Sequence, residues 1–183
     1  MKRMATLFVL AGMVALVVAA GAAFAATVIN CQVSVPCLGT DGPDELYGTA
    51  KYDRMEASQG DDLLYGRRGP DLLMGDDSGQ PTSPTDGNDQ LYGNRGRDDL
   101  YGDGGSDLLN GGHGNDYIDA AEYPLTSSIG SEDTVIAGGG DDDVSAYDWH
   151  FDTIDCGDGS DRVTYDAGLD EISENCETAN PGS

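Results

Sequence analysis

Apolar residues recur at intervals of nine along most of the chain, and each stands two residues after an aspartate. In a strand, neighbouring side chains point to opposite faces, so only the apolar residue of a D-x-L-x segment would face inward. The pattern therefore predicts a series of three-residue strands, each with one core residue. The expected core residues are Leu46, Met55, Leu64, Leu73, Leu91, Leu100, Leu109, Ile118, Val135, Val144, Ile154, Val163 and Ile172.

Glycine-rich turns are expected between these strands. In the unit GRRGPDLLM (66–74), glycines hold positions 1 and 4 and the aspartate holds position 6. Glycine suits such turns because it adopts positive φ and allows close approach of the backbone. The unit GDDSGQPTS (75–83) has Gln80 at position 6, and we expect it to bulge out as a loop while keeping the frame. The aspartates at position 6 are Asp44, Asp53, Asp62, Asp71, Asp89, Asp98, Asp107, Asp116, Asp133, Asp142, Asp152, Asp161 and Asp170.

A single unit cannot bury its one apolar residue, whereas stacked units can line those residues up in a continuous core. Two nine-residue units would make one turn of a coil, with a short strand on each side. The expected fold is therefore all-β: a right-handed parallel β-roll, a β-solenoid of nine-residue repeats with two units per turn, over residues 39–173.

The charge balance limits the partners that such a roll can take. The chain has 183 residues, with 34 Asp plus Glu against 9 Lys plus Arg and a formal net charge of −25. Nucleic acid and anionic membranes attract basic surfaces, so this composition argues against both and favours cations. The core is thin and the stacked carboxylates repel one another, so a bound cation is expected to stabilise the fold.

The N-terminus has the features of a secretory signal peptide over residues 1–25. Lys2 and Arg3 precede the apolar run 7–20, and the small-x-small segment 23–25 would be the cleavage site. An uncleaved membrane anchor is the alternative, but the apolar run is short for a spanning helix. We expect a secreted, extracellular protein whose mature chain does not insert into membranes.

Export would place the four cysteines in an oxidising compartment. Local pairing of Cys31 with Cys37 and of Cys156 with Cys176 is the simplest arrangement, and zinc binding is the alternative. The first pair would lie in a lead-in (26–38). Cys176 would lie in a closing segment and tail (174–183).

Several units resemble the calcium-binding nonapeptide repeat of RTX (repeats-in-toxin, hemolysin-type) proteins, G-G-x-G-x-D-x-U-x. GGHGNDYID (111–119) matches every fixed position, and GDGGSDLLN, GNRGRDDLY, GRRGPDLLM and ASQGDDLLY match with one or two substitutions. The C-terminal DTIDCGDGSDRVTYD and ENCET are similar to the ends of short secreted actinobacterial proteins of this type. The resemblance implies Ca²⁺ ions between turns on one edge, held by aspartate carboxylates and backbone carbonyls near glycine.

The resemblance therefore assigns candidate calcium ligands. Asp and Gly are also common in turns without any ligand. The expected pairs across one edge are Asp44–Asp62, Asp53–Asp71, Asp71–Asp89, Asp89–Asp107, Asp98–Asp116, Asp142–Asp161 and Asp152–Asp170. Position-3 side chains that could add oxygen are Asp41, Asp77, Asp86 and Asp158. The position-4 glycines assigned to the sites are Gly60, Gly69, Gly87, Gly96, Gly105 and Gly114.

The most direct functional hypothesis is a secreted protein that binds several Ca²⁺ ions and folds on binding them. The alternative is a calcium-dependent adhesion or ligand-binding module with a cell-surface or glycan partner. It would use the outward tyrosines or an exposed aromatic patch near Trp149, although tyrosine also simply suits a half-exposed strand. A hydrolase is less favoured, because no nucleophile–base pair or HExxH segment is present and His113 and His150 lie in turns. We expect no enzyme activity. The outward tyrosines are Tyr47, Tyr65, Tyr92 and Tyr101.

Overall fold

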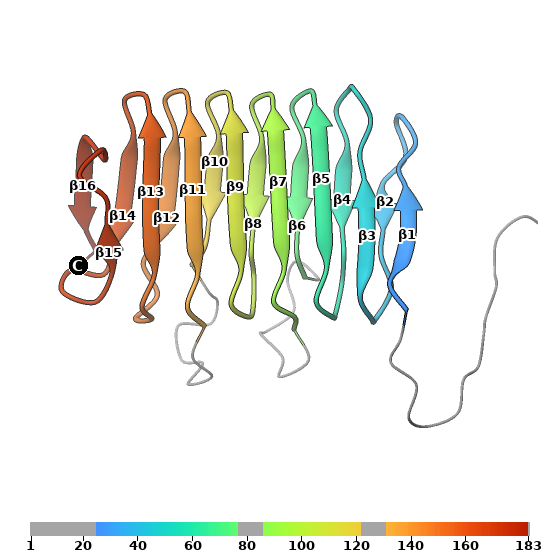
Figure 1. The fold of residues 1–183 in the computed structure, drawn as a ribbon, viewed down its shortest axis with the longest axis horizontal. Helices are drawn as coiled ribbons and strands as arrows, with labels where there is room; N and C mark the ends of the chain where they lie inside the picture. Colours follow the sequence, from blue (N-terminus) through green and yellow to red (C-terminus); the bar gives the residue numbers. More distant parts are fainter. Residues whose placement is uncertain (1–24, 77–85, 122–130, 183) are drawn as a thin grey trace, which may run out of the picture.

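The structure, a computed structural model, describes residues 25–76, 86–121 and 131–182. Their strands form two eight-stranded parallel sheets that face each other (Figure 1). The odd sheet contains β1 (Thr27–Asn30), β3 (Asp44–Tyr47), β5 (Leu63–Arg68), β7 (Gln90–Arg95), β9 (Leu108–His113), β11 (Thr134–Gly139), β13 (Thr153–Asp158) and β15 (Glu171–Ile172). The even sheet contains β2 (Cys37–Leu38), β4 (Arg54–Glu56), β6 (Leu72–Met74), β8 (Asp99–Tyr101), β10 (Tyr117–Asp119), β12 (Asp143–Ala146), β14 (Arg162–Tyr165) and β16 (Thr178–Pro181).

The chain alternates between the two sheets at every strand. In Figure 1 it runs up an odd strand at the front, passes over the top, descends along an even strand behind and advances to the left. This path is a right-handed coil with two strands per turn. The predicted all-β parallel roll is therefore confirmed.

The predicted apolar residues form the core between the sheets. Along the odd sheet, Leu46, Leu64 and Leu91 stand at matching register positions, and all three are fully buried. Leu73 and Leu100 do the same in the even sheet. Because each coil places its inward residue against those of the neighbouring coils, one apolar residue per unit is enough to make a continuous seam.

The odd strands are longer than expected. β5 covers six residues, and its burial pattern shows a second inward position at Gly66. The even strand β6 has the expected three residues. Position 1 of the following unit is thus a second core position. It continues the odd strand β11 at Ala137 and follows the even strand β4 at Ala57. This position must be small because a Cβ at Gly66 would lie close to the Asp71 carboxylate and to the Gly93 carbonyl oxygen of the next coil.

In the described sheets, unit 75–83 contributes no strand between β6 and β7. Leu63 pairs in register with Gln90, whereas Glu45 pairs with Leu63 one coil earlier. The step is 27 residues here and 18 elsewhere in this part of the coil. The expected loop at 75–83 lies mostly outside the described residues, Gln80 included, and it stays a prediction.

Disulfides close both ends of the coil as expected. Cys31 is bonded to Cys37 and Cys156 to Cys176, with Cα–Cα distances of 5.2 Å in both pairs. Cys37 and Cys156 are buried in the core, so each bond ties an end segment to the seam. Apart from Ala25, the expected signal peptide lies outside the described residues. Where the chain is described, it forms no helix with the length and hydrophobicity that crossing a membrane would require.

Candidate metal centre

The position-6 aspartates line the two edges of the coil where the sheets meet. We call the turns that lead into even strands the upper edge and those that lead into odd strands the lower edge (Figure 1). The upper edge holds Asp53, Asp71, Asp98, Asp116, Asp142 and Asp161. The lower edge holds Asp44, Asp62, Asp89, Asp107, Asp133, Asp152 and Asp170.

Each edge carries a ladder of hydrogen bonds between successive coils. On the upper edge, the Asp71 backbone N–H donates to Asp98 Oδ1 and the Asp98 N–H donates to Asp116 Oδ1, both at 2.8 Å. On the lower edge, the Asp62 N–H donates to Asp89 Oδ1 at 2.8 Å, and the pattern continues to Asp170. One carboxylate oxygen per turn is therefore fixed by the coil itself.

One expected pair is wrong, and the step of 27 residues between β5 and β7 explains why. Asp71 was expected opposite Asp89, but Asp71 pairs with Asp98 and Asp89 pairs with Asp62. Because unit 75–83 contributes no strand to the described sheets, the aspartates after it move to the other edge from the one that simple counting gives. The pairs Asp44–Asp62, Asp53–Asp71, Asp89–Asp107, Asp98–Asp116, Asp142–Asp161 and Asp152–Asp170 are adjacent as expected.

The second carboxylate oxygen of the interior aspartates is buried without a hydrogen-bond partner among the described residues. A buried ionised oxygen without a partner is costly, so such a group either takes up a proton or coordinates a cation. The arrangement recurs at eight interior aspartates on both edges, which points to one shared ligand chemistry. These oxygens are Oδ2 of Asp62, Asp71, Asp89, Asp98, Asp107, Asp116, Asp142 and Asp161.

Backbone carbonyls of the next coil approach the same places. A side chain at Gly66 would put its Cβ 2.7 Å from Asp71 Oδ2 and 3.0 Å from the carbonyl oxygen of Gly93. At Gly93, the corresponding point is 2.6 Å from both Asp98 Oδ2 and the carbonyl oxygen of Gly111. A carboxylate oxygen and a carbonyl oxygen from adjacent coils therefore converge beside each position-1 glycine.

The position-4 glycines stack directly on one another. Gly96 and Gly114 have φ values of 152° and 137°, and a Cβ on Gly114 would overlap the carbonyl oxygen of Gly96. Gly87 and Gly105 repeat this contact on the lower edge. Only glycine fits here, and its carbonyl points along the stack toward the next turn.

In the first coil, threonines take the place of the ladder hydrogen bond at one oxygen of each aspartate. Thr40 donates to Asp44 Oδ2 through its N–H at 2.6 Å and its hydroxyl at 3.0 Å. Thr49 likewise donates to Asp53 Oδ2 through its N–H at 2.5 Å and its hydroxyl at 2.9 Å. At the far end, Glu177 replaces an aspartate by accepting from the Asp161 N–H at 3.0 Å. The ladders thus end on protein partners, although Oδ1 of Asp44 and of Asp53 is buried without a hydrogen-bond partner among the described residues.

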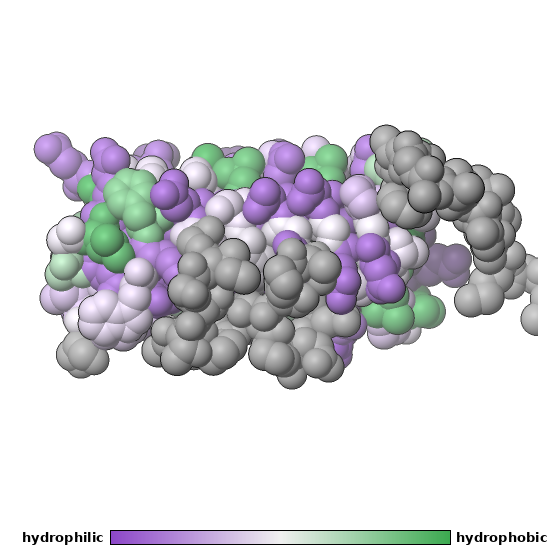
Figure 2. Space-filling model, turned by 90° about the horizontal axis from the view of Figure 1, so that it is seen from below, coloured by the Kyte–Doolittle hydropathy of each residue, from purple (hydrophilic) through white to green (hydrophobic). Residues whose placement is uncertain are grey.

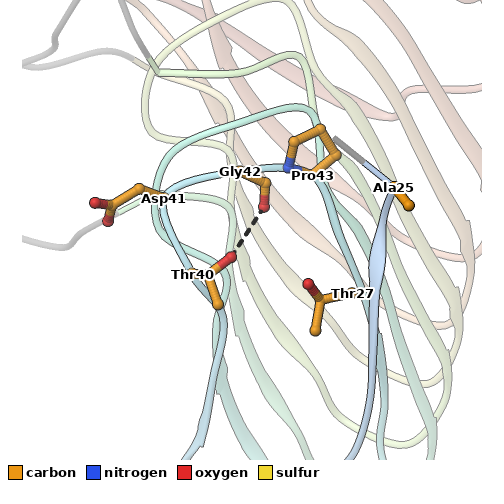
Figure 3. A pocket seen from close by; sticks show the side chains of 6 residues that line it. All are labelled: Ala25, Thr27, Thr40, Asp41, Gly42 and Pro43. Atoms are coloured by element: carbon orange, nitrogen blue, oxygen red, sulfur yellow. Dashed lines mark hydrogen bonds between the residues drawn. The ribbon is translucent and has the colours of Figure 1, made fainter. Parts of the chain in front are cut away.

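The expected position-3 oxygens are less well placed than the position-6 carboxylates. Figure 3 shows the exposed Asp41 pointing away from the hollow of about 320 Å³ that Thr27, Thr40 and Pro43 help to line. Asp158 is exposed and Asp86 is half-buried. Asp77 lies outside the described residues.

Two position-2 aspartates that sequence reasoning missed lie on the lower edge. Asp76 is buried and accepts a long hydrogen bond of 3.3 Å from the Gly104 N–H, while its Oδ1 has no partner. Asp103, one coil further on, also has a buried oxygen without a partner. The repeat pattern gave no signal for them, because position 2 is not among its aspartates.

Burial is the main influence on the carboxyl groups of both ladders. Burial first, and neighbouring carboxylates as a smaller cause, raise the pKa of Asp62, Asp71 and Asp89 from 3.8 to about 8. Burial raises the pKa of Asp98 and Asp116 to about 6. The ladder hydrogen bonds lower these pKa values but do not compensate. Without a cation, the folded chain therefore holds protons at these sites.

These pKa shifts predict that acid stabilises the ion-free roll. Each carboxyl binds its proton more tightly in the folded chain than in the unfolded chain, where the pKa is 3.8. Stability should therefore fall as the pH rises from about 4 to about 8, by proton linkage. Circular dichroism of the calcium-free chain should show β signal growing as the pH falls through 8 and 6. A signal that stays flat over this range would contradict the prediction.

No three His, Cys, Asp or Glu side chains converge on one point among the described residues. Any cation would thus have to combine few carboxylates with several carbonyl oxygens. Ca²⁺ accepts six to eight oxygen ligands, including backbone carbonyls, in flexible geometry. The donors along the two edges fit this ion better than they fit zinc, which prefers nitrogen and sulfur ligands.

The outward tyrosines contact one another instead of opening a binding face. The rings of Tyr47, Tyr65 and Tyr92 stack with centroid distances of 5.3 and 5.0 Å and interplanar angles of 10° and 15°. Tyr101 lies on the other sheet, where it packs against Tyr117 at 5.7 Å. Since the interior ring faces are covered, this ladder stabilises the sheet more than it offers a sugar platform.

The turn between β12 and β13 carries the expected exposed aromatic group. Trp149 is 64% exposed with φ 77° and packs on Tyr147, and Phe151 is 40% exposed. Figure 2, which views the lower edge, shows a mainly hydrophilic surface with a hydrophobic group at the C-terminal end of the coil.

Comparison with known proteins gives one family match. The model of the RTX calcium-binding nonapeptide repeat (4 copies) matches residues 38–73 and 84–120. No curated protein and no solved structure matches the chain. The match omits residues 74–83, where the coil steps by 27 residues. Beyond residue 120 the aspartate ladder continues through Asp142 and Asp161, so the repeat geometry extends further than the match.

Proposed function

We propose that this chain, which carries RTX calcium-binding nonapeptide repeats over residues 38–73 and 84–120, binds several Ca²⁺ ions between stacked turns and folds on binding them. The observation that carries the proposal is the row of buried carboxylate oxygens without partners at successive interior turns of both edges. The repeated family pattern supplies the identity of the ion.

The strongest candidate sites lie in the interior of the two ladders. On the upper edge these are the steps Asp71–Asp98 and Asp98–Asp116, and on the lower edge Asp62–Asp89 and Asp89–Asp107. Each step would offer one open carboxylate oxygen and carbonyls near the position-1 and position-4 glycines. At Asp44 and Asp53, Thr40 and Thr49 occupy Oδ2 in place of a ladder N–H, and Oδ1 is the open oxygen.

Folding on binding follows from the same charges. The unfolded chain holds no preformed site, so binding to the coil alone adds the binding free energy to its stability. Without ions at neutral pH, each buried carboxyl either stays charged at a high desolvation cost or binds a proton that it would not hold in the unfolded chain. The disulfides suit an extracellular setting, where calcium is also abundant. We therefore place the protein outside the cell.

We assign no enzyme activity. Two neighbouring carboxylates could resemble the catalytic pair of a glycosidase. Here the nine-residue repeat and the ladder hydrogen bonds account for the neighbouring aspartates, so no catalytic role is needed to explain them. The adhesion alternative was based largely on the tyrosines, whose rings now prove to be stacked on one another. Calcium binding remains the function that the geometry supports best.

A calcium titration of the full mature chain at neutral pH tests the proposal. Circular dichroism should show little β signal in chelator and a cooperative gain at high micromolar to millimolar Ca²⁺, the range of extracellular sites. Mg²⁺ should not substitute, because it demands near-ideal octahedral geometry and keeps its waters. A chain equally folded in chelator, or folded equally by Mg²⁺, would disprove the proposal.

A further inference from the structure

The few basic residues of this acidic chain are concentrated in one place. Of its 9 lysines and arginines, five lie in three consecutive turns of the upper edge. The sheets stack these turns on adjacent coils, at the upper ends of β5 and β7 and in the turns beside them (Figure 1). A chain with net charge −25 thus presents a local basic patch. Its residues are Lys51, Arg67, Arg68, Arg95 and Arg97.

Part of this patch forms a shallow hollow of about 440 Å³ on the outer face of the odd sheet. Arg68 pairs in register with Arg95, and Arg95 with His113. Neighbouring strands lie about 4.8 Å apart, so these side chains begin side by side in one row. Arg67 and Asn94, also in register with each other, complete the lining.

The arginines of the hollow have no carboxylate partners among the described residues. In that part of the chain, the arginine ion pairs are Arg54 with Glu56 and Arg162 with Asp143, both outside the patch. Arg67 lies over the Tyr47 ring, 5.4 Å from its centroid, which positions the guanidinium without using its in-plane N–H donors. The donors therefore remain available to a ligand.

The backbone supports a role beyond folding. Arg67 and Asn94 are in the left-handed region, with φ 77° and 73°, and the next coils carry glycine at the same register, beginning with Gly112 at φ 99°. A side chain in this conformation is strained, and glycine would avoid that strain. Backbone strain of this kind is frequent at binding sites. Among the described residues, the contact with the Tyr47 ring is the interaction that Arg67 gains in return for this conformation.

We propose that this hollow binds a tetrahedral oxyanion, as found in inorganic sulfate or phosphate and in their esters on extracellular polymers. Guanidinium groups match such oxygens with paired N–H donors, and two arginines in register on adjacent strands can hold one group from both sides. Arg68 and Arg95 provide the main donors, with Arg67 beside them and His113 extending the row. Because the hollow requires the stacked coils, the site rests on the proposed calcium-dependent fold.

The test measures binding to the calcium-saturated full chain by isothermal titration calorimetry, with sodium sulfate and sulfated dextran as probes and neutral dextran as the blank. The double variant Arg68→Gln/Arg95→Gln should bind sulfated dextran about tenfold more weakly or worse, since charge-assisted hydrogen bonds are lost. The matched control Arg54→Gln/Arg162→Gln removes the same charge elsewhere and should stay within about twofold of wild type. Calcium-dependent circular dichroism must be unchanged in both variants, which separates loss of this site from failure of the fold.

A further variant separates oxyanion recognition from simple attraction. Arg68→Lys/Arg95→Lys keeps the charge but loses the forked donors, so it should also bind clearly more weakly than wild type. Competition by free sulfate would identify the simple ion as sufficient, whereas binding of sulfated dextran alone would identify an ester on a polymer. Wild-type affinity in the Gln double variant, or an equal loss in the control, would overturn the proposal.

Discussion

Replacing Gly114 with alanine is expected to destabilise the calcium-loaded roll by about 3 kcal/mol or more. Gly114 has φ 137°, which alanine rarely adopts, and an added Cβ would overlap the Gly96 carbonyl oxygen and lie 2.5 Å from its carbonyl carbon. Both atoms belong to the backbone of the preceding turn, so relief would require the coils to separate. Urea unfolding in saturating Ca²⁺ measures the loss.

Gly42→Ala is the matched control. Gly42 also occupies position 4, but it lies in the first turn of the lower edge and has nothing within 4 Å of its added Cβ. Its φ is not in the left-handed region, so the change should cost no more than about 0.5 kcal/mol. Equal losses in the two variants would show that stacking of the position-4 glycines is not what limits the coil.

The fold could be predicted from the sequence because the repeat leaves few alternatives. One apolar residue per unit, as at Leu64 and Leu91, can be buried only when successive units stack in register. The length of the odd strands could not be predicted. Gly66 was expected in a turn, but it continues β5, because the coil needs a second small inward position there. Glycine in a repeat does not by itself distinguish a turn from a close contact.

The candidate site was predicted less completely than the fold. The position-6 aspartates stand on the edges as expected, but the pair Asp71–Asp89 failed. Counting in nines does not show whether a unit adds a strand to a sheet. Unit 75–83 adds none to the described sheets, so Asp71 pairs with Asp98. Thr40 and Thr49, which donate to aspartates of the first coil, could not be recognised from the sequence, and neither could Asp76 at position 2. Their roles depend on which turn they stack against.

The second large effect is expected from Asp107→Asn, and its sign should depend on calcium. Asp107 Oδ1 accepts the Asp89 N–H at 2.8 Å, a bond that an asparagine carbonyl can keep, while the open Oδ2 becomes an amide nitrogen. Burial, then the Asp133 and Asp89 carboxylates, raise the Asp107 pKa well above its usual range. In chelator at neutral pH, asparagine removes a carboxyl that must take up a proton in order to be buried, so the ion-free roll should become more stable. In calcium it removes a charged ligand, so the folding midpoint should move to about tenfold higher Ca²⁺.

Asp99→Asn provides the control for this reversal. Asp99 lies on the outer face of β8, beside the inward Leu100. Its replacement by asparagine removes the same formal charge without changing a ladder carboxylate. It should shift the calcium midpoint less than twofold and change the ion-free chain far less than Asp107→Asn does, since the half-buried Asp99 is only a minor cause of the raised pKa of Asp98 and Asp116. Circular dichroism across a calcium series, with and without chelator, measures both effects. If Asp107→Asn weakened the chain equally in both conditions, its carboxylate would serve packing alone. A change of sign between the two conditions is the result that only a cation on the lower edge can produce.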